Sequence, residues 1–497
     1  MKNLVQNLLL PLGAALLLGG CAAVGPDYSA PSATARYPVS FGEGSQGLGP
    51  GNVEVQWWRA FDEPVLVSLI QRALAANHDI AIAAMRLEEA KAILRENRQS
   101  FLPSGGPAFG YESFKRSDAE TPSGQARHIE TYRASVDASW EIDLFGRVRR
   151  SVEAAQAQAG SREALLRDVQ ASVAAAVAAT WFELRGLQVE RAVVDDISKS
   201  QRESLHMVER LVQAGSAHEV DRLRAEAFLH AVEATAPDLE RRRAASSNAL
   251  AVLLGEAPQT FGLPAASAEL HTLAIRTIGI GDPAGLLARR ADIVAAERNL
   301  AAATAQIGVE TAGLYPEVQV RGSLGLVAGS LDALNDAGAP SNFIAPVIRW
   351  SLLDRGRVRA RIAASEARSQ QALLLYEQTL LRALQETDDA FKGYGAAGST
   401  LALQLLESAA SREAARLARE RFSAGEGLYL EVLEAERSDL NSRRALAVAR
   451  TNQRLAVVSI YKALGGGWEV CTQPDQDCSG AGESKSLSFV RQISARP

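Results

Sequence analysis

Between residues 132 and 142 the chain alternates strictly between apolar and polar side chains. The even positions carry Tyr, Ala, Val, Ala, Trp and Ile, and the odd positions carry Arg, Ser, Asp, Ser and Glu. A period of two predicts a β-strand with one apolar and one polar face. After Gly146 the pattern changes to an alanine-rich run, and no proline occurs before Pro237. This run predicts a very long helix that ends near Ala214.

A seven-residue period runs along this predicted helix and is broken only at Gln201. Its members are Leu166, Val173, Thr180, Leu187, Val194 and Val208. A sustained seven-residue period indicates left-handed supercoiling against neighbouring helices. Gly215 is the first good break, and we expect a second long helix to return from it toward Leu254.

The pattern occurs twice along the chain. The motif W-x5-G-R-V-R at Trp140 recurs at Trp350, and an Asp-Ile pair at Asp79 recurs at Asp292. Alternating segments predict four strands, near residues 103–114, 132–142, 318–326 and 344–352. Each half is therefore expected to contain a helix, two strands joined by a loop, a long helix, a tight turn and a returning helix.

The predicted organisation is a duplicated, mainly α-helical chain with membrane β-strands. A helix is expected from residue 64 to about residue 101. The expected segments are a signal peptide (1–20), an N-terminal tether (21–65), a first repeat (66–280, strands about 103–143, helical hairpin about 147–255), a second repeat (281–464, strands about 316–353, hairpin about 355–464) and a C-terminal tail (465–497).

Four strands with apolar outer faces resemble porin-type membrane strands. In lipid, unpaired strand edges have no water to satisfy their N–H and C=O groups, and single-chain barrels begin at about eight strands. Several copies must therefore pool their strands, and three copies would give 3 × 4 = 12. The strand-end aromatics Trp140, Phe145 and Trp350 fit an interfacial girdle. Six arginines follow these aromatic residues and would either face lipid headgroups or be ordinary solvated charges at the start of a helix: Arg147, Arg149, Arg150, Arg355, Arg357 and Arg359.

Composition and motifs argue against several function classes. The net charge of −5 gives no support for nucleic-acid binding. The six histidines are scattered without metal-ligand spacing, and neither a G-x-S-x-G motif nor a phosphate loop is present. We therefore expect no enzyme activity, no metal site and no cofactor other than covalent lipid.

The N-terminus has the features of a targeting segment. Lys2 precedes an apolar run, and Leu18-Gly-Gly-Cys21 resembles the lipobox of bacterial lipoproteins. This resemblance implies acylation of Cys21 and, because Ala22 is not aspartate, an outer-membrane location. The alternative is a plain signal peptide with an incidental cysteine. Cys471 and Cys478 would form a disulfide in an oxidising periplasm or remain two free thiols.

Taken together, these stretches resemble the outer-membrane efflux lipoproteins of RND-type tripartite pumps, the TolC/OprM-like outer membrane factors of the NodT-like branch. The matching stretches begin at Cys21, Trp57, Trp140 and Arg289 and include the two glycine turns. The resemblance implies a homotrimer with a 12-stranded barrel, a periplasmic α-helical tunnel and an equatorial belt. The belt would come from residues 22–64, about 248–283 and the tail. Ala291 stands where the family commonly has proline, so a helix start there is in question.

The resemblance also implies site residues and partners. The turns at Gly215 and Gly425, with Arg210 and Arg421, would dock a periplasmic adaptor, which connects to an inner-membrane pump. Glu431, Glu434 and Asp221 match an acidic constriction. Gly427 occupies the position of a basic gate residue, so that salt bridge is not expected. Alternatively, the two glycines only cap the ends of their helices, and the three acids are ordinary solvated charges on helix surfaces.

The expected function is the outer-membrane exit duct of a tripartite efflux pump for small toxic compounds. A duct for type I protein secretion would share this architecture, although the lipobox favours efflux. A structural coiled-coil lipoprotein would explain the helices and the anchor but not four membrane-type strands.

Overall fold

A computed structural model describes residues 23–31, 49, 56–263, 279 and 289–466. The chain forms two compact units. Unit 1 comprises residues 1–32, 84–164 and 292–379, and unit 2 comprises residues 33–83, 165–291 and 380–497. Cys21, Cys471 and Cys478 lie outside the described residues, as do the signal peptide and the tail after residue 466.

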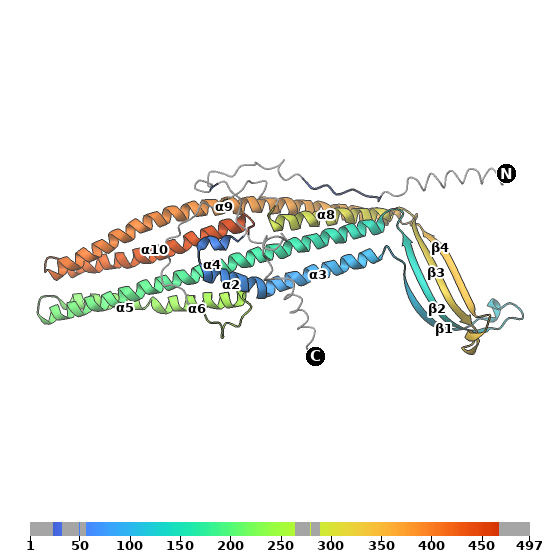
Figure 1. Cartoon of the computed structure of the whole chain (residues 1–497), viewed down its shortest axis with the longest axis horizontal. Helices are drawn as coiled ribbons and strands as arrows, with labels where there is room; N and C mark the ends of the chain where they lie inside the picture. The colour runs from blue at the N-terminus through green and yellow to red at the C-terminus, as the bar shows by residue number, and fades with distance from the viewer. Residues whose placement is uncertain (1–22, 32–48, 50–55, 264–278, 280–288, 467–497) are drawn as a thin grey trace. The chain divides into compact units, whose positions relative to one another are not determined.

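Unit 1 contains one antiparallel sheet with the strand order β1-β2-β3-β4 (Figure 1). Two hairpins make up the sheet, and the central pairing of β2 with β3 joins the two repeats. The strands are β1 (Ser104–Lys115), β2 (His128–Ile142), β3 (Glu317–Ala328) and β4 (Pro340–Arg349), with short 3-10 turns η3 (Asp118–Glu120) and η4 (Asp332–Asn335) in the hairpin loops. All four predicted strands are confirmed.

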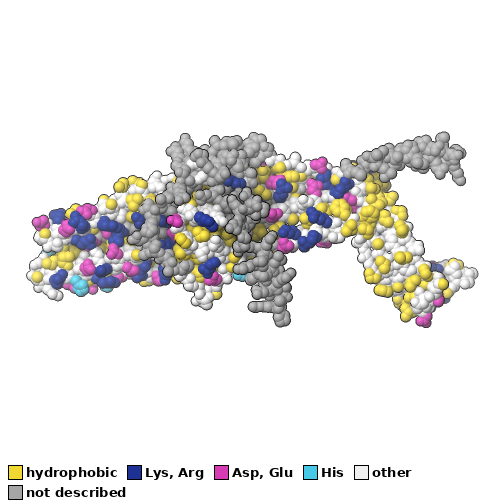
Figure 2. Space-filling view, viewed as in Figure 1, with side chains coloured by type: hydrophobic (Ala, Val, Ile, Leu, Met, Phe, Trp, Pro, Cys, Tyr) yellow, Lys and Arg dark blue, Asp and Glu magenta, His cyan; other side chains and the backbone are white. Residues whose placement is uncertain are grey.

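The predicted apolar face of the sheet is exposed in the single chain. Val136 is 57% exposed, Leu324 69% and Ile344 83%. Figure 2 shows hydrophobic side chains distributed over the strands. The prediction was wrong at one end, because β4 stops at Arg349 and leaves Trp350 and Leu352 beyond the strand. There the Trp350 indole N–H bonds the carbonyl oxygen of Leu314, 3.0 Å away.

Two very long helices follow the strands, as the proline-free runs predict. The helix α4 (Arg147–Gln213) has 67 residues and α9 (Arg355–Ser423) has 69. At 1.5 Å per residue, each spans roughly 100 Å. The remaining helices are η2 (Trp57–Phe61), α2 (Pro64–Ala76), α3 (His78–Gln99), α5 (Glu219–Glu233), α6 (Ala236–Leu253), α8 (Ala291–Ala312) and α10 (Tyr429–Ala463). The helix start at Ala291 is thus present without a proline. None of the described helices is both long and apolar enough to cross a membrane.

The single helix expected from residue 64 to about residue 101 is in fact two helices. Asn77 breaks it with an extended ψ of 132°. Its side-chain oxygen accepts hydrogen bonds from the N–H groups of Asp79 (2.9 Å) and Ile80 (3.2 Å), which caps α3. Its amide nitrogen donates to the carbonyl of Leu253 at 2.9 Å. One asparagine therefore ends α2, starts α3 and ties both to the end of α6.

The returning helix of the first repeat is also divided, contrary to prediction. The helix α5 ends at Glu233, and α6 begins with Pro237 in its first turn. Proline cannot donate the hydrogen bond that would continue α5. In the second repeat, where no proline intervenes, α10 is a single helix of 35 residues.

Aromatic residues near the N-terminus of unit 2 form the centre of its core. Trp57 is 1% exposed and stacks on Tyr461, with ring centroids 5.3 Å apart. Trp181 on α4 is equally buried, and its indole N–H donates to Glu63 at 2.6 Å. Residues 57–63 therefore join α4 to α10. Gly49 and Gly279, from two of the predicted belt segments, form a parallel bridge.

Candidate functional site

Each repeat places a tryptophan at the base of its hairpin, Trp140 near the end of β2 and Trp350 directly after β4. The indole N–H of Trp140 donates to the carbonyl of Phe101, and that of Trp350 donates to the carbonyl of Leu314, each at 3.0 Å. Both rings remain partly exposed, at 39% and 48%. The acceptors lie just after α3 and α8, so each tryptophan fixes the approach of a helix to a strand. An amphipathic ring with a satisfied N–H suits a membrane interface.

Phe145 lies at the same junction and stacks on Tyr315. Their ring centroids are 4.7 Å apart and the planes are inclined by 20°. Phe145 belongs to the first repeat and Tyr315 to the second, so this stack joins the two copies within unit 1. The predicted girdle residues are thus brought to the helix–strand junctions of one unit.

The arginines at the starts of the two long helices differ in burial and in ion-pair partners, although the sequence gives them similar positions. Arg147 forms an ion pair with Glu141, Nε to Oε1 2.8 Å, and Arg149 pairs with Asp143 at 3.1 Å. Arg150 is 4% exposed, so the expectation that it faces lipid headgroups was wrong. Most of its partners lie in residues 23–27, and Glu153 on the same helix is another. In the second repeat Arg357 remains 75% exposed, and Arg355 and Arg359 are exposed as well.

The glycine turns close the two helical hairpins as predicted. Gly215 has φ +70° and Gly425 has φ +80°, a conformation that strongly favours glycine. In the first turn the N–H of Ser216 donates to the carbonyl of Leu211 at 2.8 Å, and the second turn repeats this bond from Glu426 to Arg421 at 2.9 Å. These are the C-terminal caps of α4 and α9. Arg210 and Arg421 are exposed beside the turns.

The predicted constriction acids lie near the second turn and on α5. Glu431 and Glu434 are exposed one turn apart on α10. Arg421 approaches Glu431 at 3.7 Å, and both side chains are at least half exposed. Asp221 is 18% exposed and lies 3.5 Å from Arg224. Gly427 offers no cation, so Arg421 supplies the positive charge from the opposite side of the turn. The electrostatic contribution of such exposed pairs is small.

A buried polar cluster near these acids was not predicted. Glu436 on α10 is 3% exposed and accepts hydrogen bonds from Gln201 (2.6 Å) and Ser204 (3.2 Å) on α4. Arg419 on α9 lies 3.6 Å away. Burial raises the pKa of the Glu436 carboxyl, and these partners oppose the shift. Gln201, which interrupts the heptad series, is therefore the buried partner of an acid 235 residues later.

Tyr429 lies in the same region of unit 2. It is 3% exposed and packs against Phe422, with ring centroids 5.5 Å apart. Burial, together with Glu436 and Asp221, raises the pKa of its phenol. The apolar cluster that includes it draws its side chains from α4, α5, α6, α9 and α10. The expected gate acids therefore lie next to a packed core that contains buried polar groups.

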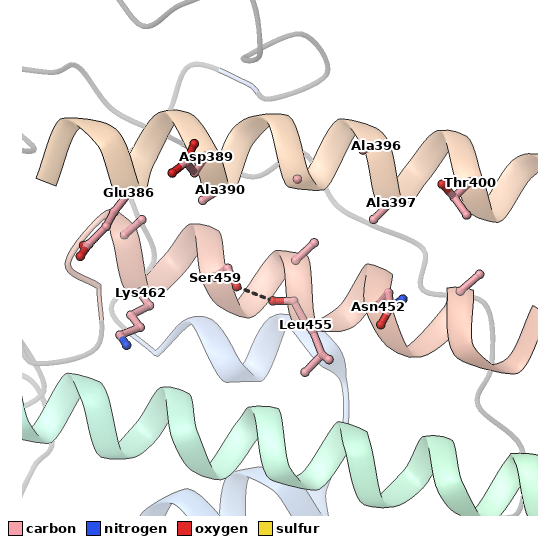
Figure 3. Close-up of a pocket in the computed structure, with 14 residues that line it drawn as sticks. Glu386, Asp389, Ala390, Ala396, Ala397, Thr400, Asn452, Leu455, Ser459 and Lys462 are labelled. Atoms are coloured by element: carbon pink, nitrogen blue, oxygen red, sulfur yellow. Dashed lines mark hydrogen bonds between the residues drawn. The ribbon is translucent and has the colours of Figure 1, made fainter. Parts of the chain in front are cut away.

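A groove of about 730 Å³ runs between α9 and α10 (Figure 3). Small residues dominate its walls, among them Gly393, Ala397 and Ala456, while Glu386, Asp389 and Lys462 contribute charge. Within it Ser459 donates to the carbonyl of Leu455 at 3.0 Å, which closes a local helical bond. Among the described residues no cluster of three or more His, Cys, Asp or Glu side chains is placed to hold a metal ion.

Comparison with known proteins places these features in one family. Residues 69–256 and 283–466 match the model of the outer membrane efflux protein family. The solvent efflux pump outer membrane protein SrpC of Pseudomonas putida is 33% identical over 467 residues, which cover 93% of this chain and 98% of SrpC. The antibiotic efflux pump outer membrane protein ArpC of the same species is 30% identical over 474 residues, covering 94% and 96%.

A solved structure has the same fold. The outer-membrane channel OprN superposes with a TM-score of 0.84 at 34% identity, covering 90% of this chain and all of the OprN chain. The two matched family segments correspond to the two repeats identified from the sequence.

Proposed function

The chain belongs to the outer membrane efflux protein family, and from this premise we propose how its residues form the exit duct of a tripartite pump. It is an outer-membrane efflux channel, as its relatives are. The predicted fold class, mainly helical with four strands from a duplicated sequence, is that of these channels. Its assembly, its partners and its gate are inferred from the sheet edges, the hairpin turns and the acids beside them.

The observation that carries the proposal is the open sheet of unit 1. The strands β1 and β4 are its edges, and its exposed apolar residues fit a lipid-facing surface. Unpaired backbone groups in hydrocarbon are strongly unfavourable. We propose that three copies pair β1 of one with β4 of the next to close a barrel of 3 × 4 = 12 strands. The long helices α4 and α9 would then form the tunnel wall.

The partners follow from this arrangement. A periplasmic adaptor would dock at the turns marked by Gly215 and Gly425, where Arg210 and Arg421 are exposed. An inner-membrane pump would supply the cargo, and acyl chains on Cys21 would add a lipid anchor. The relatives' names mention solvents and antibiotics, which supports small organic compounds as cargo rather than secreted proteins. A duct of this kind needs neither a cofactor nor a catalytic residue.

The gate proposal concerns Glu431 and Glu434. If both face the axis from three chains, six carboxylates converge there. Like charges about 4 Å apart repel by about 1 kcal/mol in water and about 4 kcal/mol at an effective dielectric constant near 20. The mouth should therefore select cations and be blocked by multivalent cations from the tip side.

The experiment is single-channel conductance of the reconstituted full-length protein, with a trivalent cation titrated on the tip side. Glu431→Gln combined with Glu434→Gln should remove most of the block and leave assembly intact, because both side chains are exposed. Equal block in wild type and double variant would overturn the gate proposal. No conductance from correctly inserted protein would overturn the duct proposal and favour a structural lipoprotein.

A further inference from the structure

Residues 23–31 follow Cys21 closely and lie against the junction of β2 and α4 within unit 1. The N–H of Val24 donates to the carbonyl of Phe145 at 3.1 Å. Arg150 donates hydrogen bonds to the backbone of residues 23–31, which we call the N-terminal peptide. Its Nε donates to the Val24 carbonyl at 3.1 Å, and one Nη donates to the carbonyls of Gly25 (3.4 Å) and Ala23 (3.5 Å). One guanidinium thus binds three consecutive carbonyls, a use of its forked donors that lysine cannot reproduce.

Side chains extend this contact beyond the backbone. Arg150 also binds the carboxylate of Asp27 at 2.6 Å, while Glu153 holds its other terminal nitrogen at 2.8 Å. The hydroxyl of Tyr28 donates to Glu297 on α8. The Arg150 side chain is only 5% exposed. A buried charge is tolerated when its donors are satisfied, and most of its acceptors here belong to the peptide.

Two glycine contacts shape the site so closely that a methyl group would not fit. Gly25 has φ +91°, and a Cβ there would lie 2.5 Å from the Cα of Gly308 on α8. Gly146 has φ +81°, and a Cβ there would lie 2.4 Å from the Cβ of Ala23. The peptide backbone therefore lies directly against the start of α4 and against α8.

The internal duplication provides a comparison within the same chain. At the equivalent positions of the other repeat, Arg150 is replaced by Ala360, Gly308 by Arg95 and Glu297 by Ala84. The equivalent of Gly146 is Gly356, around which a Cβ would meet no atom within 4 Å. Both repeats nevertheless begin their long helices with Gly-Arg-Val-Arg. The long helices therefore form without Arg150, Gly308 and Glu297 or their counterparts. These three residues occur only at the positions that contact the N-terminal peptide.

We infer that Gly146, Arg150, Glu297 and Gly308 form a binding site for the chain's own mature N-terminal peptide, and that this site fixes where the acyl chains enter the membrane. Ala23 is two residues beyond Cys21, so at most about 7 Å of extended backbone separates the Cα atom of the lipidated residue from the bound peptide. The statement about lipid entry rests on the proposed acylation of Cys21. The peptide site does not.

The test is the mobility of a spin label at Ser29→Cys in full-length protein, with Cys471→Ser and Cys478→Ser to remove other labelling sites. Ser29 is exposed, so a label there does not disturb the contacts. The label should be immobilised in the parent protein. Arg150→Ala should raise the mobile fraction about tenfold or more, because several charge-assisted bonds are lost together. Arg359→Ala, at the exposed start of α9, is the matched control and should leave the label immobile.

Two changes on the peptide itself keep the test decisive if Arg150→Ala does not fold. Gly25→Ala and Asp27→Ala alter the ligand and leave the helices untouched, and each should also release the label. An immobile label in both variants, or a mobile label in the parent, overturns the inference. Cys21→Ser should leave the label immobile, and release by that change alone would mean that lipid holds the segment. A parent protein that lacks lipid by mass spectrometry would refute the lipid-entry statement. The label would then be measured in the Cys21→Ser protein, where only Ser29→Cys reacts, and an immobile label there would support the peptide site.

Discussion

Gln201 on α4 donates a hydrogen bond of 2.6 Å to Glu436 on α10, and both side chains are at least 97% buried. This bond connects the long helix of the first repeat to the returning helix of the second. The surrounding side chains are largely apolar. A buried polar pair of this kind tolerates few shifts in helix register, because either partner alone would be left unsatisfied.

The Glu436 carboxyl should make stability depend on pH. Burial raises its pKa above the unfolded value, so the folded state binds the proton more tightly. The associated stabilisation is complete below the unfolded pKa of about 4.3 and is lost as pH rises through the folded pKa. The melting temperature of Glu436→Gln relative to wild type should therefore increase as pH rises through this window. Glu434→Gln, an exposed neighbour on the same helix, is the control and should show no such trend.

Asn77→Ala should destabilise unit 2 by about 1–2 kcal/mol, because it removes the cap of α3 and the bond to the Leu253 carbonyl. Asn77→Asp keeps the capping oxygen but loses the amide donor, so its loss should be smaller. The measurement is the thermal unfolding midpoint in detergent. Identical midpoints for wild type and Asn77→Ala would contradict the assigned role.

Trp140 and Trp350 should lie at the membrane interface. In a Trp468→Phe background, which removes the tryptophan outside the described residues, fluorescence in vesicles of brominated lipid should be quenched chiefly through these two partly exposed rings, since Trp57, Trp58 and Trp181 are at most 2% exposed. The double change to phenylalanine should remove most of the quenching while keeping an aromatic ring at each site. Undiminished quenching would place the two rings away from lipid.

Replacing the glycine at either hairpin turn should destabilise that turn. Gly215→Ala and Gly425→Ala each force a side chain into positive φ and should destabilise their turn by about 1 kcal/mol. Hydrogen exchange at the last residues of α4 or α9 should become faster. Gly427→Ala is a suitable control, because its φ is not in the left-handed region and its Cβ would meet the Glu431 carboxylate at an ordinary 3.4 Å. Equal effects at Gly425 and Gly427 would argue against the cap assignment.

Periodic features of this chain could be predicted from sequence, and features that depend on a distant partner could not. The strand β2, the helix α4 and the two turns follow from local patterns, each within a short stretch. Gln201, Asn77 and Arg150 have partners 235, 176 and 126 residues away. In sequence they look like a break in a heptad, an ordinary polar residue and one of several arginines. Only the fold distinguishes a satisfied buried group from a solvated one.

The two tryptophan anchors affect how the hairpin loops of the channel can vary during evolution. Trp140 reaches a carbonyl 39 residues back, and Trp350 reaches its equivalent 36 residues back, with the same 3.0 Å bond. The three-residue difference is therefore absorbed within the hairpins, away from the anchors. Hairpin loops such as residues 116–127 can lengthen or shorten without disturbing the base of the sheet. In the proposed barrel these loops lie at the end of the strands away from the anchors, so the loops can vary in length and sequence around a constant conduit.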